Sequence, residues 1–73
     1  MQTYISRDLE TGKKIKCENT GKKLGDRVIW RNVETGELYE RMNPNGVKMG
    51  MRGKLFFRKY NKPTTEYILQ NIL

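Results

Sequence analysis

The residues of this sequence that are best suited to binding chemistry form a run of cations and aromatic rings in its C-terminal part. Positions 43–73 hold six basic residues and one acid, Glu66, whereas positions 1–42 hold nine basic and seven acidic residues. Cations contact phosphates and release counterions, and rings stack on unpaired bases. We therefore expect the main binding face at Lys48, Arg52, Lys54, Phe56, Arg58, Lys59, Tyr60 and Lys62.

The alternation of side chains along this run supports a strand with one binding face. In an extended strand, Lys54, Phe56, Arg58 and Tyr60 point to one side, and Leu55 and Phe57 point to the other side and enter the core. Two alternatives stay open for the same pattern. The cations could meet an acidic protein surface, or contacts between cations and rings across strands could be purely structural.

A second group of cations surrounds a predicted hairpin nearer the N-terminus. It is diluted by Glu10 and Glu18, so we interpret it mainly as a solvated surface that extends the first face. This secondary basic patch consists of Lys13, Lys14, Lys16, Lys22 and Lys23.

Catalytic chemistry is disfavoured by the residues that the sequence lacks. There is no histidine, which removes the usual general base near neutral pH and the commonest metal ligand. The single cysteine, Cys17, has no histidine to activate it, and closed zinc sites need about four ligands. No GxxxxGK[ST] or GxGxxG motif is present. We expect no enzymatic activity, no metal and no cofactor, and we expect Cys17 to be a small buried residue beside Ile15.

An internal repeat with an offset of 24 positions indicates how the chain folds locally. The segment Ile5-Ser6-Arg7-Asp8-Leu9-Glu10-Thr11-Gly12-Lys13 resembles Ile29-Trp30-Arg31-Asn32-Val33-Glu34-Thr35-Gly36-Glu37. Each copy predicts a strand, a three-residue Glu-Thr-Gly turn with glycine in the left-handed region, and a second strand. Two hairpins with the same convenient turn and a true duplication both explain the repeat.

Alternating apolar and polar positions predict six short strands, separated by turns at 43–46 and 50–53 and by an exposed loop at 18–25. The strands are expected at 2–8, 13–18, 27–33, 37–42, 47–51 and 54–60. Trp30 is the natural anchor of the small core. After Pro63, Thr64 could cap a helix at 65–71 that covers the sheet, or that binds a partner.

With 73 residues the chain is long enough for one domain with a thin core. We expect an all-β fold, mainly an antiparallel meander in a small SH3-like or OB-like barrel, with one C-terminal α-helix. One cysteine precludes an internal disulfide and favours a reducing, cytoplasmic location, and no apolar run is long enough for a membrane span.

A net charge of +7 predicts an anionic partner. The leading interpretation is a non-enzymatic module that binds DNA or RNA through the phosphate backbone with aromatic stacking. The alternative is a small accessory or inhibitor protein, of a kind common in bacteriophages, that docks on an acidic surface of a larger host protein. A ribosome-associated protein is a third possibility that the charge permits.

Overall fold

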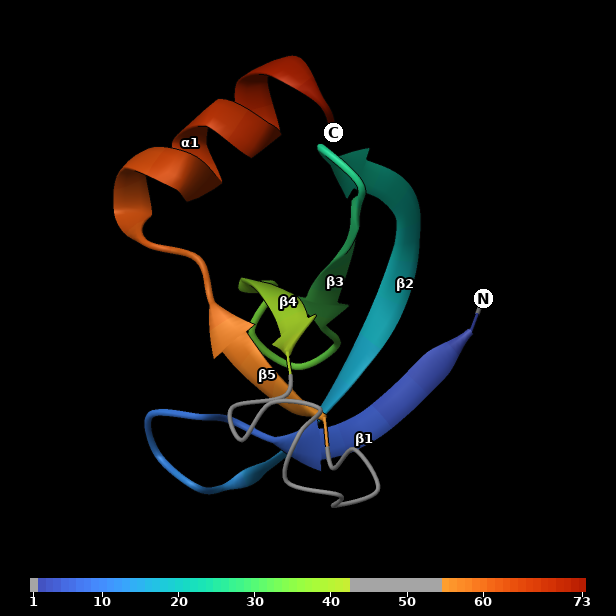
Figure 1. The fold of residues 1–73 in the computed structure, drawn as a ribbon, viewed down its shortest axis with the longest axis vertical. Helices are drawn as coiled ribbons and strands as arrows, with labels where there is room; N and C mark the ends of the chain where they lie inside the picture. Colours follow the sequence, from blue (N-terminus) through green and yellow to red (C-terminus); the bar gives the residue numbers. More distant parts are fainter. Residues whose placement is uncertain (1, 43–54) are drawn as a thin grey trace.

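The computed structural model describes residues 2–42 and 55–73, which form a sheet of five strands followed by one helix (Figure 1). Neighbours in the sheet are consecutive in sequence, and every pair is antiparallel. Short turns join the first four strands, and such turns can connect only antiparallel neighbours. The elements are β1 (Thr3–Arg7), β2 (Lys14–Leu24), β3 (Arg27–Asn32), β4 (Leu38–Met42), β5 (Phe56–Lys59) and α1 (Lys62–Asn71).

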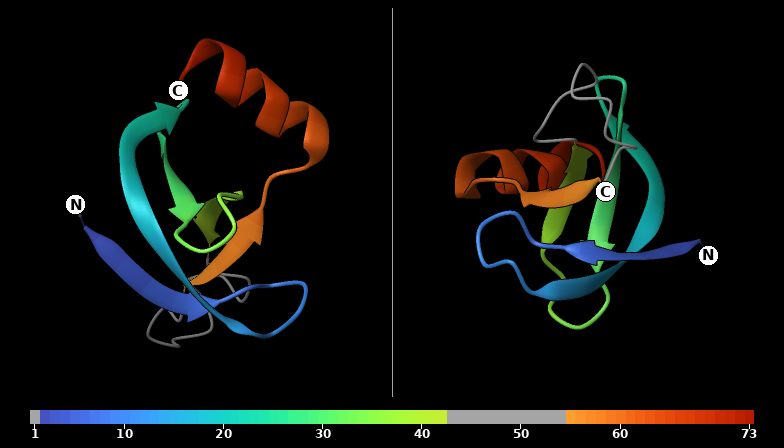
Figure 2. Two further views of the ribbon diagram at one scale, coloured as in Figure 1. Left: turned by 180° about the vertical axis from the view of Figure 1, so that it is seen from behind. Right: turned by 60° about the horizontal axis from the view of Figure 1, so that its bottom comes forward.

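The sheet is curled into a half-barrel in which the first and last strands meet along a seam (Figure 2). Asp8 forms a parallel bridge with Phe57, and the Leu9 N–H donates to the Phe57 carbonyl at 2.8 Å. The Ser6 hydroxyl donates to the Leu55 carbonyl at the same seam. The predicted all-β fold, a curled antiparallel meander with one C-terminal helix, is confirmed.

The two copies of the repeat form hairpins with closely matching turns. Gly12 and Gly36 have φ of 73° and 80°, as the sequence predicted. In each turn one side-chain oxygen, from Asp8 or from Asn32, accepts the N–H two residues later at 2.8 Å. The Asp8 N–H donates to the Lys13 carbonyl, so the first loop comprises residues 9–12, one more than predicted. The longer loop is accommodated because the side-chain oxygen accepts hydrogen bonds from N–H groups of the turn.

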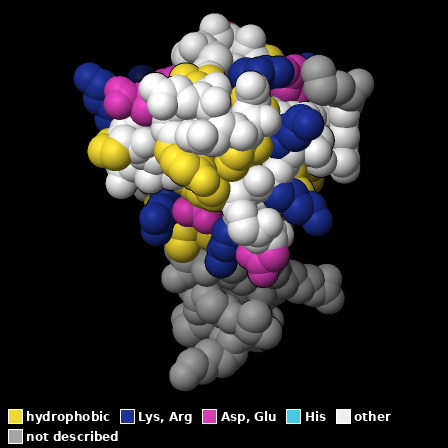
Figure 3. All heavy atoms as spheres, turned by 90° about the horizontal axis from the view of Figure 1, so that it is seen from above, with side chains coloured by type: hydrophobic (Ala, Val, Ile, Leu, Met, Phe, Trp, Pro, Cys, Tyr) yellow, Lys and Arg dark blue, Asp and Glu magenta, His cyan; other side chains and the backbone are white. Residues whose placement is uncertain are grey.

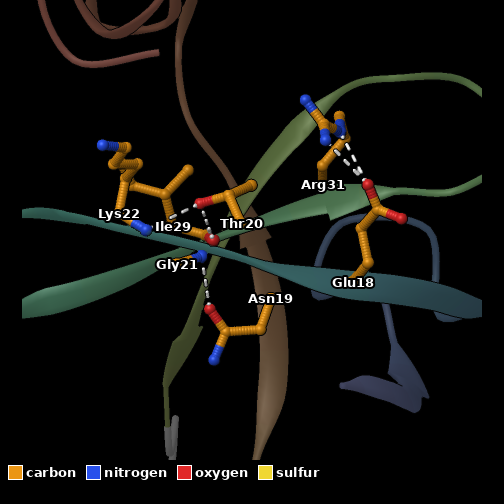
Figure 4. A network of polar contacts seen from close by, with 7 residues as sticks. All are labelled: Glu18, Asn19, Thr20, Gly21, Lys22, Ile29 and Arg31. Atoms are coloured by element: carbon orange, nitrogen blue, oxygen red, sulfur yellow. Dashed lines mark hydrogen bonds and ion pairs between the residues drawn. The ribbon is translucent and has the colours of Figure 1, made fainter. Parts of the chain in front are cut away.

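The segment 18–25 was predicted to be an exposed loop, and this prediction is wrong for most of its length. The segment continues β2, which pairs with β3 through a register shift between Asn19 and Lys23. Figure 4 shows the local cause: the Asn19 side chain accepts the Gly21 N–H at 2.8 Å, and the Thr20 hydroxyl donates to the Ile29 carbonyl at 2.8 Å. Gly21 has a φ of 79°, so the residues that suggested a loop build a bulge within a strand.

The concave side of the half-barrel holds the first of two apolar clusters. Cys17, Trp30, Tyr39 and Phe57 are buried there, with Ile15 packed against them. The expected burial of Trp30 and Cys17 is confirmed, at 4% and 0% exposure. Three of the rings lie at tilted or edge-on angles with centroids 5.7–6.1 Å apart, which is a favourable arrangement for aromatic rings.

The second cluster lies on the opposite side of the sheet, beneath α1. Ile29 of β3, Leu38 of β4 and Ile68 of the helix are buried there, with Tyr60 and Ile72 packed at its border. The helix therefore covers the sheet, as the first of the two predictions for it proposed. Its outward surface exposes apolar side chains among scattered cations and carboxylates (Figure 3).

The helix begins earlier than predicted, and its cap is Asn61 rather than Thr64. The Asn61 side chain accepts the Thr64 N–H at 2.9 Å, and Pro63 lies within the first turn. Proline is tolerated there because the N–H that it lacks would have no partner inside the helix. The strand at 47–51 and the turns at 43–46 and 50–53 lie outside the described residues.

Candidate functional site

The two cations that β5 contributes to the predicted main face are both paired with carboxylates, one within β4 and one in the turn directly before it. Arg58 Nε lies 3.3 Å from Glu40 Oε2, and the Lys59 ammonium contacts Glu37. The acid-poor run in the sequence is therefore not acid-poor in space, since antiparallel pairing sets β4 directly beside β5. Three further members of the predicted face, Lys48, Arg52 and Lys54, lie outside the described residues.

The Glu37–Lys59 contact shifts the pKa of each group in the direction expected for an ion pair. The hydrogen bond from Lys59 holds the pKa of Glu37 below its ordinary value, and the same hydrogen bond raises the pKa of Lys59. Both groups are therefore charged at neutral pH and compensate each other. Such exposed pairs add little stability, but they lower the net charge that a ligand meets.

The two aromatic residues of the predicted face lie in different surroundings. The Tyr60 ring packs against the Ile29–Leu38–Ile68 cluster, and burial followed by Glu40 raises its pKa. This ring is partly buried at the border of that cluster, so the expected exposed position of Tyr60 is not what the structure shows. Phe56 is half-buried and lines a groove beside β1. Lys62 is exposed in the first turn of α1.

The secondary basic patch divides into two groups because β2 is long. Lys14 and Lys16 lie at its beginning, with Lys13 directly before it, and Lys22 and Lys23 lie near its end. At about 3.3 Å per residue, Lys16 and Lys22 are about 20 Å apart along the strand. A single small ligand cannot contact both groups.

The beginning of β2 shares its outer surface with β1, and we call this surface the first-hairpin face; it consists of Ile5, Arg7, Lys14 and Lys16. Ile5 pairs with Lys16 and Arg7 pairs with Lys14, and directly opposed residues project to the same side of a sheet. All four side chains are exposed.

The cations of the first-hairpin face have no ion pair within the part of the chain that the structure describes. The nearest acid along β2, Glu18, is already engaged by Arg31, whose guanidinium approaches it at 2.8 Å and 3.0 Å (Figure 4). The Arg7 guanidinium donates to the Gly12 carbonyl at 2.6 Å and retains further N–H groups for a ligand.

Two arginines with structural or binding potential were missed by the sequence analysis. Arg7 is two positions after Ile5 on β1 and shares its side of the sheet. The register of the predicted first hairpin could have shown that Arg7 lies beside Lys14. Arg41 is two positions after Tyr39 on β4, so its side chain projects to the same, concave side. Its guanidinium lies 4.0 Å from the Tyr4 ring centroid and 5.3 Å from that of Trp30. These contacts favour a structural role for Arg41.

Cys17 lies in the concave cluster, where its thiol is buried. Burial, followed by the nearby Asp8 charge, raises the pKa of its thiol to about 12, so it is protonated at neutral pH. Within residues 2–42 and 55–73, no group of three or more His, Cys, Asp or Glu residues could hold a metal ion. The expected lack of enzymatic activity stays a prediction.

In the described part of the chain, no helix is both long enough and apolar enough to cross a membrane.

Comparisons with protein-family models, with curated proteins and with solved structures found no match to this chain. Its function is therefore inferred from its own residues and their arrangement.

Proposed function

We propose that this protein is a non-enzymatic nucleic-acid-binding module that holds the phosphate backbone on the first-hairpin face. The observation that carries the proposal is the set of exposed cations there, Arg7, Lys14 and Lys16, which lack carboxylate partners among the described residues. A cation without a partner can bind a phosphate with no intramolecular ion pair to break, and the release of counterions drives such binding.

The test compares two double variants that remove the same charge. Lys14→Gln with Lys16→Gln changes the first-hairpin face, and Arg58→Gln with Lys59→Gln changes the paired cations of β5. Fluorescence anisotropy with labelled single and double strands of DNA and RNA, measured across a salt series, gives affinity and salt dependence. Thermal melts establish that each variant is folded.

We expect the first double variant to reduce the log–log salt slope by about 1.4 for a single strand or about 1.8 for B-DNA, which corresponds to two lost phosphate contacts. The second double variant has the same net charge and should retain most of the parent slope. Equal losses in the two variants would place the binding elsewhere, and a parent protein that binds no nucleic acid at low salt would refute the proposal.

One observation favours the alternative, a protein that docks on an acidic surface of a larger partner. Ile5 is 61% exposed and Val33 is 44% exposed, and both lie beside Lys16, because Ile5 pairs with it and the Val33 N–H donates to its carbonyl at 3.0 Å. Apolar groups surrounded by cations suit a protein interface with an acidic rim. Partners that remain on the immobilised protein after nuclease treatment, and that Ile5→Glu releases, would support this alternative.

A further inference from the structure

A groove of about 550 Å³ lies at the seam of the half-barrel, directly beside the first-hairpin face. Its walls come from β1, from the first residue of β2 and from the residues at the start of β5, and three of its lining residues, Ile5, Arg7 and Lys14, also belong to that face. The groove is within the size range of sites that bind small molecules. Its position makes it a continuation of the proposed phosphate-binding surface.

The two walls of the groove are held together by the contacts along the seam between β1 and β5. The Ser6 hydroxyl donates to the Leu55 carbonyl between the two walls, and three residues further along the chain the Leu9 N–H donates to the Phe57 carbonyl and holds the same two segments together. The ring of Tyr4 also packs against the rings of Trp30 and Phe57, at centroid distances of 6.3 Å and 6.4 Å. The described walls of the groove are therefore largely preformed.

The lining of the groove combines apolar walls with a cationic rim. Ile5, Leu55, Phe56 and the partly exposed ring of Tyr4 supply the apolar surface, and Arg7 and Lys14 supply the charge. None of the described residues that line it is acidic. This combination fits an anion that carries a flat apolar group.

A second cavity of similar size shows how selective this lining is. That cavity, about 610 Å³ between the first turn and α1, contains the cations Lys59 and Lys62 but also three carboxylates, from Glu10, Glu37 and Glu66. Its mixed charge disfavours an anionic ligand. The seam groove is thus the better match to a nucleotide, although the two volumes hardly differ.

We propose that the seam groove receives one unpaired base of a single-stranded nucleic acid, which contacts the Phe56 ring while Arg7 and Lys14 hold the adjacent phosphates. This inference rests on the proposed function and specifies its ligand. A base inside a duplex is stacked and paired, and it can enter the groove only after extrusion, which opposes binding. The site therefore selects single strands, and stacking on a ring makes the selection tolerant of sequence.

The experiment uses the full chain and three probes of equal length: a labelled oligo-dT, an abasic oligonucleotide with the same phosphates, and a duplex. Phe56→Leu removes the ring but keeps an apolar side chain, and Tyr67→Leu is its matched control because Tyr67 is an exposed ring on α1. Ile5→Glu places a carboxylate on the groove wall at an exposed position, so it tests the groove even if Phe56→Leu is destabilised. Melting curves accompany each titration.

We expect the parent to bind oligo-dT at least about tenfold more tightly than the abasic strand. Phe56→Leu should remove this advantage and leave duplex binding unchanged, Tyr67→Leu should behave as the parent, and Ile5→Glu should weaken oligo-dT by more than it weakens the duplex. Equal binding of oligo-dT and the abasic strand would overturn the groove proposal and leave phosphate binding intact. Absence of binding to all three probes would refute the proposed function itself.

An acidic peptide with one aromatic residue carries the same two chemical features as a nucleotide. If such a peptide displaces the labelled oligo-dT from the parent but not from Ile5→Glu, and binds more tightly than oligo-dT, the groove is a peptide site and the nucleic-acid assignment is wrong. Failure of the peptide to compete supports the unpaired base.

Discussion

The two copies of the repeat, the β1–β2 hairpin and the β3–β4 hairpin, have closely matching turns but different surroundings, and we call them the first and second hairpins. The Arg7–Lys14 pair of the first hairpin corresponds, 24 positions later, to the Arg31–Leu38 pair of the second. Yet Ile5 is 61% exposed, whereas its counterpart Ile29 is fully buried beneath α1. The same strand–turn–strand unit thus forms a wall of the core in one place and a free surface in another.

Few side chains account for this difference. Leu38 of the second hairpin packs against Ile29 and Ile68, whereas Lys14 occupies the corresponding position of the first hairpin and is exposed. Two positions later the corresponding residues carry opposite charges: Lys16 in the first hairpin and Glu40 in the second. Glu40 pairs with Arg27 of β3 and Arg58 of β5, whereas Lys16 has no carboxylate partner among the described residues.

Removal of the cover from the second hairpin should have the largest effect. Deletion of residues 67–73 takes away Ile68 and Ile72 and exposes Ile29 and Leu38 to water. Because a domain of this size has little core to lose, we expect loss of cooperative unfolding in circular dichroism and poor dispersion in NMR spectra. A truncated chain that stays soluble and unfolds cooperatively would mean that the helix is not needed as a cover.

The paired substitutions Ile29→Ala and Ile5→Ala measure the difference between the two surfaces directly. We expect Ile29→Ala to lower the free energy of unfolding by about 2–5 kcal/mol, since a fully buried side chain is lost. Ile5→Ala should change it by less than about 0.5 kcal/mol. Urea denaturation of the two variants provides the values, and similar losses would show that the first-hairpin face is covered in solution.

Substitutions in the two turns should reveal a similarity instead of a difference. A Cβ added at Gly12 or at Gly36 meets nothing within 4 Å, so the penalty comes from the positive φ alone. We expect Gly12→Val and Gly36→Val each to destabilise the protein by about 1–2 kcal/mol. Thermal or urea unfolding tests this, and a large inequality would indicate that the two turns are not equivalent.

The smallest predicted effect concerns the ion pair that only one of the corresponding positions forms in the described structure. Glu37 occupies the position that Lys13 holds in the first hairpin, and the hydrogen bond from Lys59 depresses the pKa of Glu37. Its slight stabilisation is therefore present above the unfolded pKa of about 4.5 and is lost as the pH falls through the lower folded pKa. In Lys59→Ala, NMR titration of the Glu37 carboxyl should give a pKa closer to its ordinary value, and an unchanged pKa would contradict this pairing.

The fold was more predictable from the sequence than the site. Side-chain alternation and the glycine turns identified the hairpins, because both signals are local. The bulge at Gly21 was missed because polar residues and glycine are as typical of a loop as of a bulged strand. The pairing of Arg58 and Lys59 was missed for a different reason: charge counted along the chain does not include the carboxylates that a neighbouring strand brings close.

The seam between β1 and β5 also has a consequence for how the protein forms. It joins Ser6 to Leu55, residues 49 positions apart, so the ends of the sheet meet only after almost the whole chain is available. Hairpins form from nearby residues within microseconds, whereas contacts of high sequence separation slow folding. On the ribosome the two hairpins can therefore form early, while the groove beside the seam has to wait until the last strand has emerged.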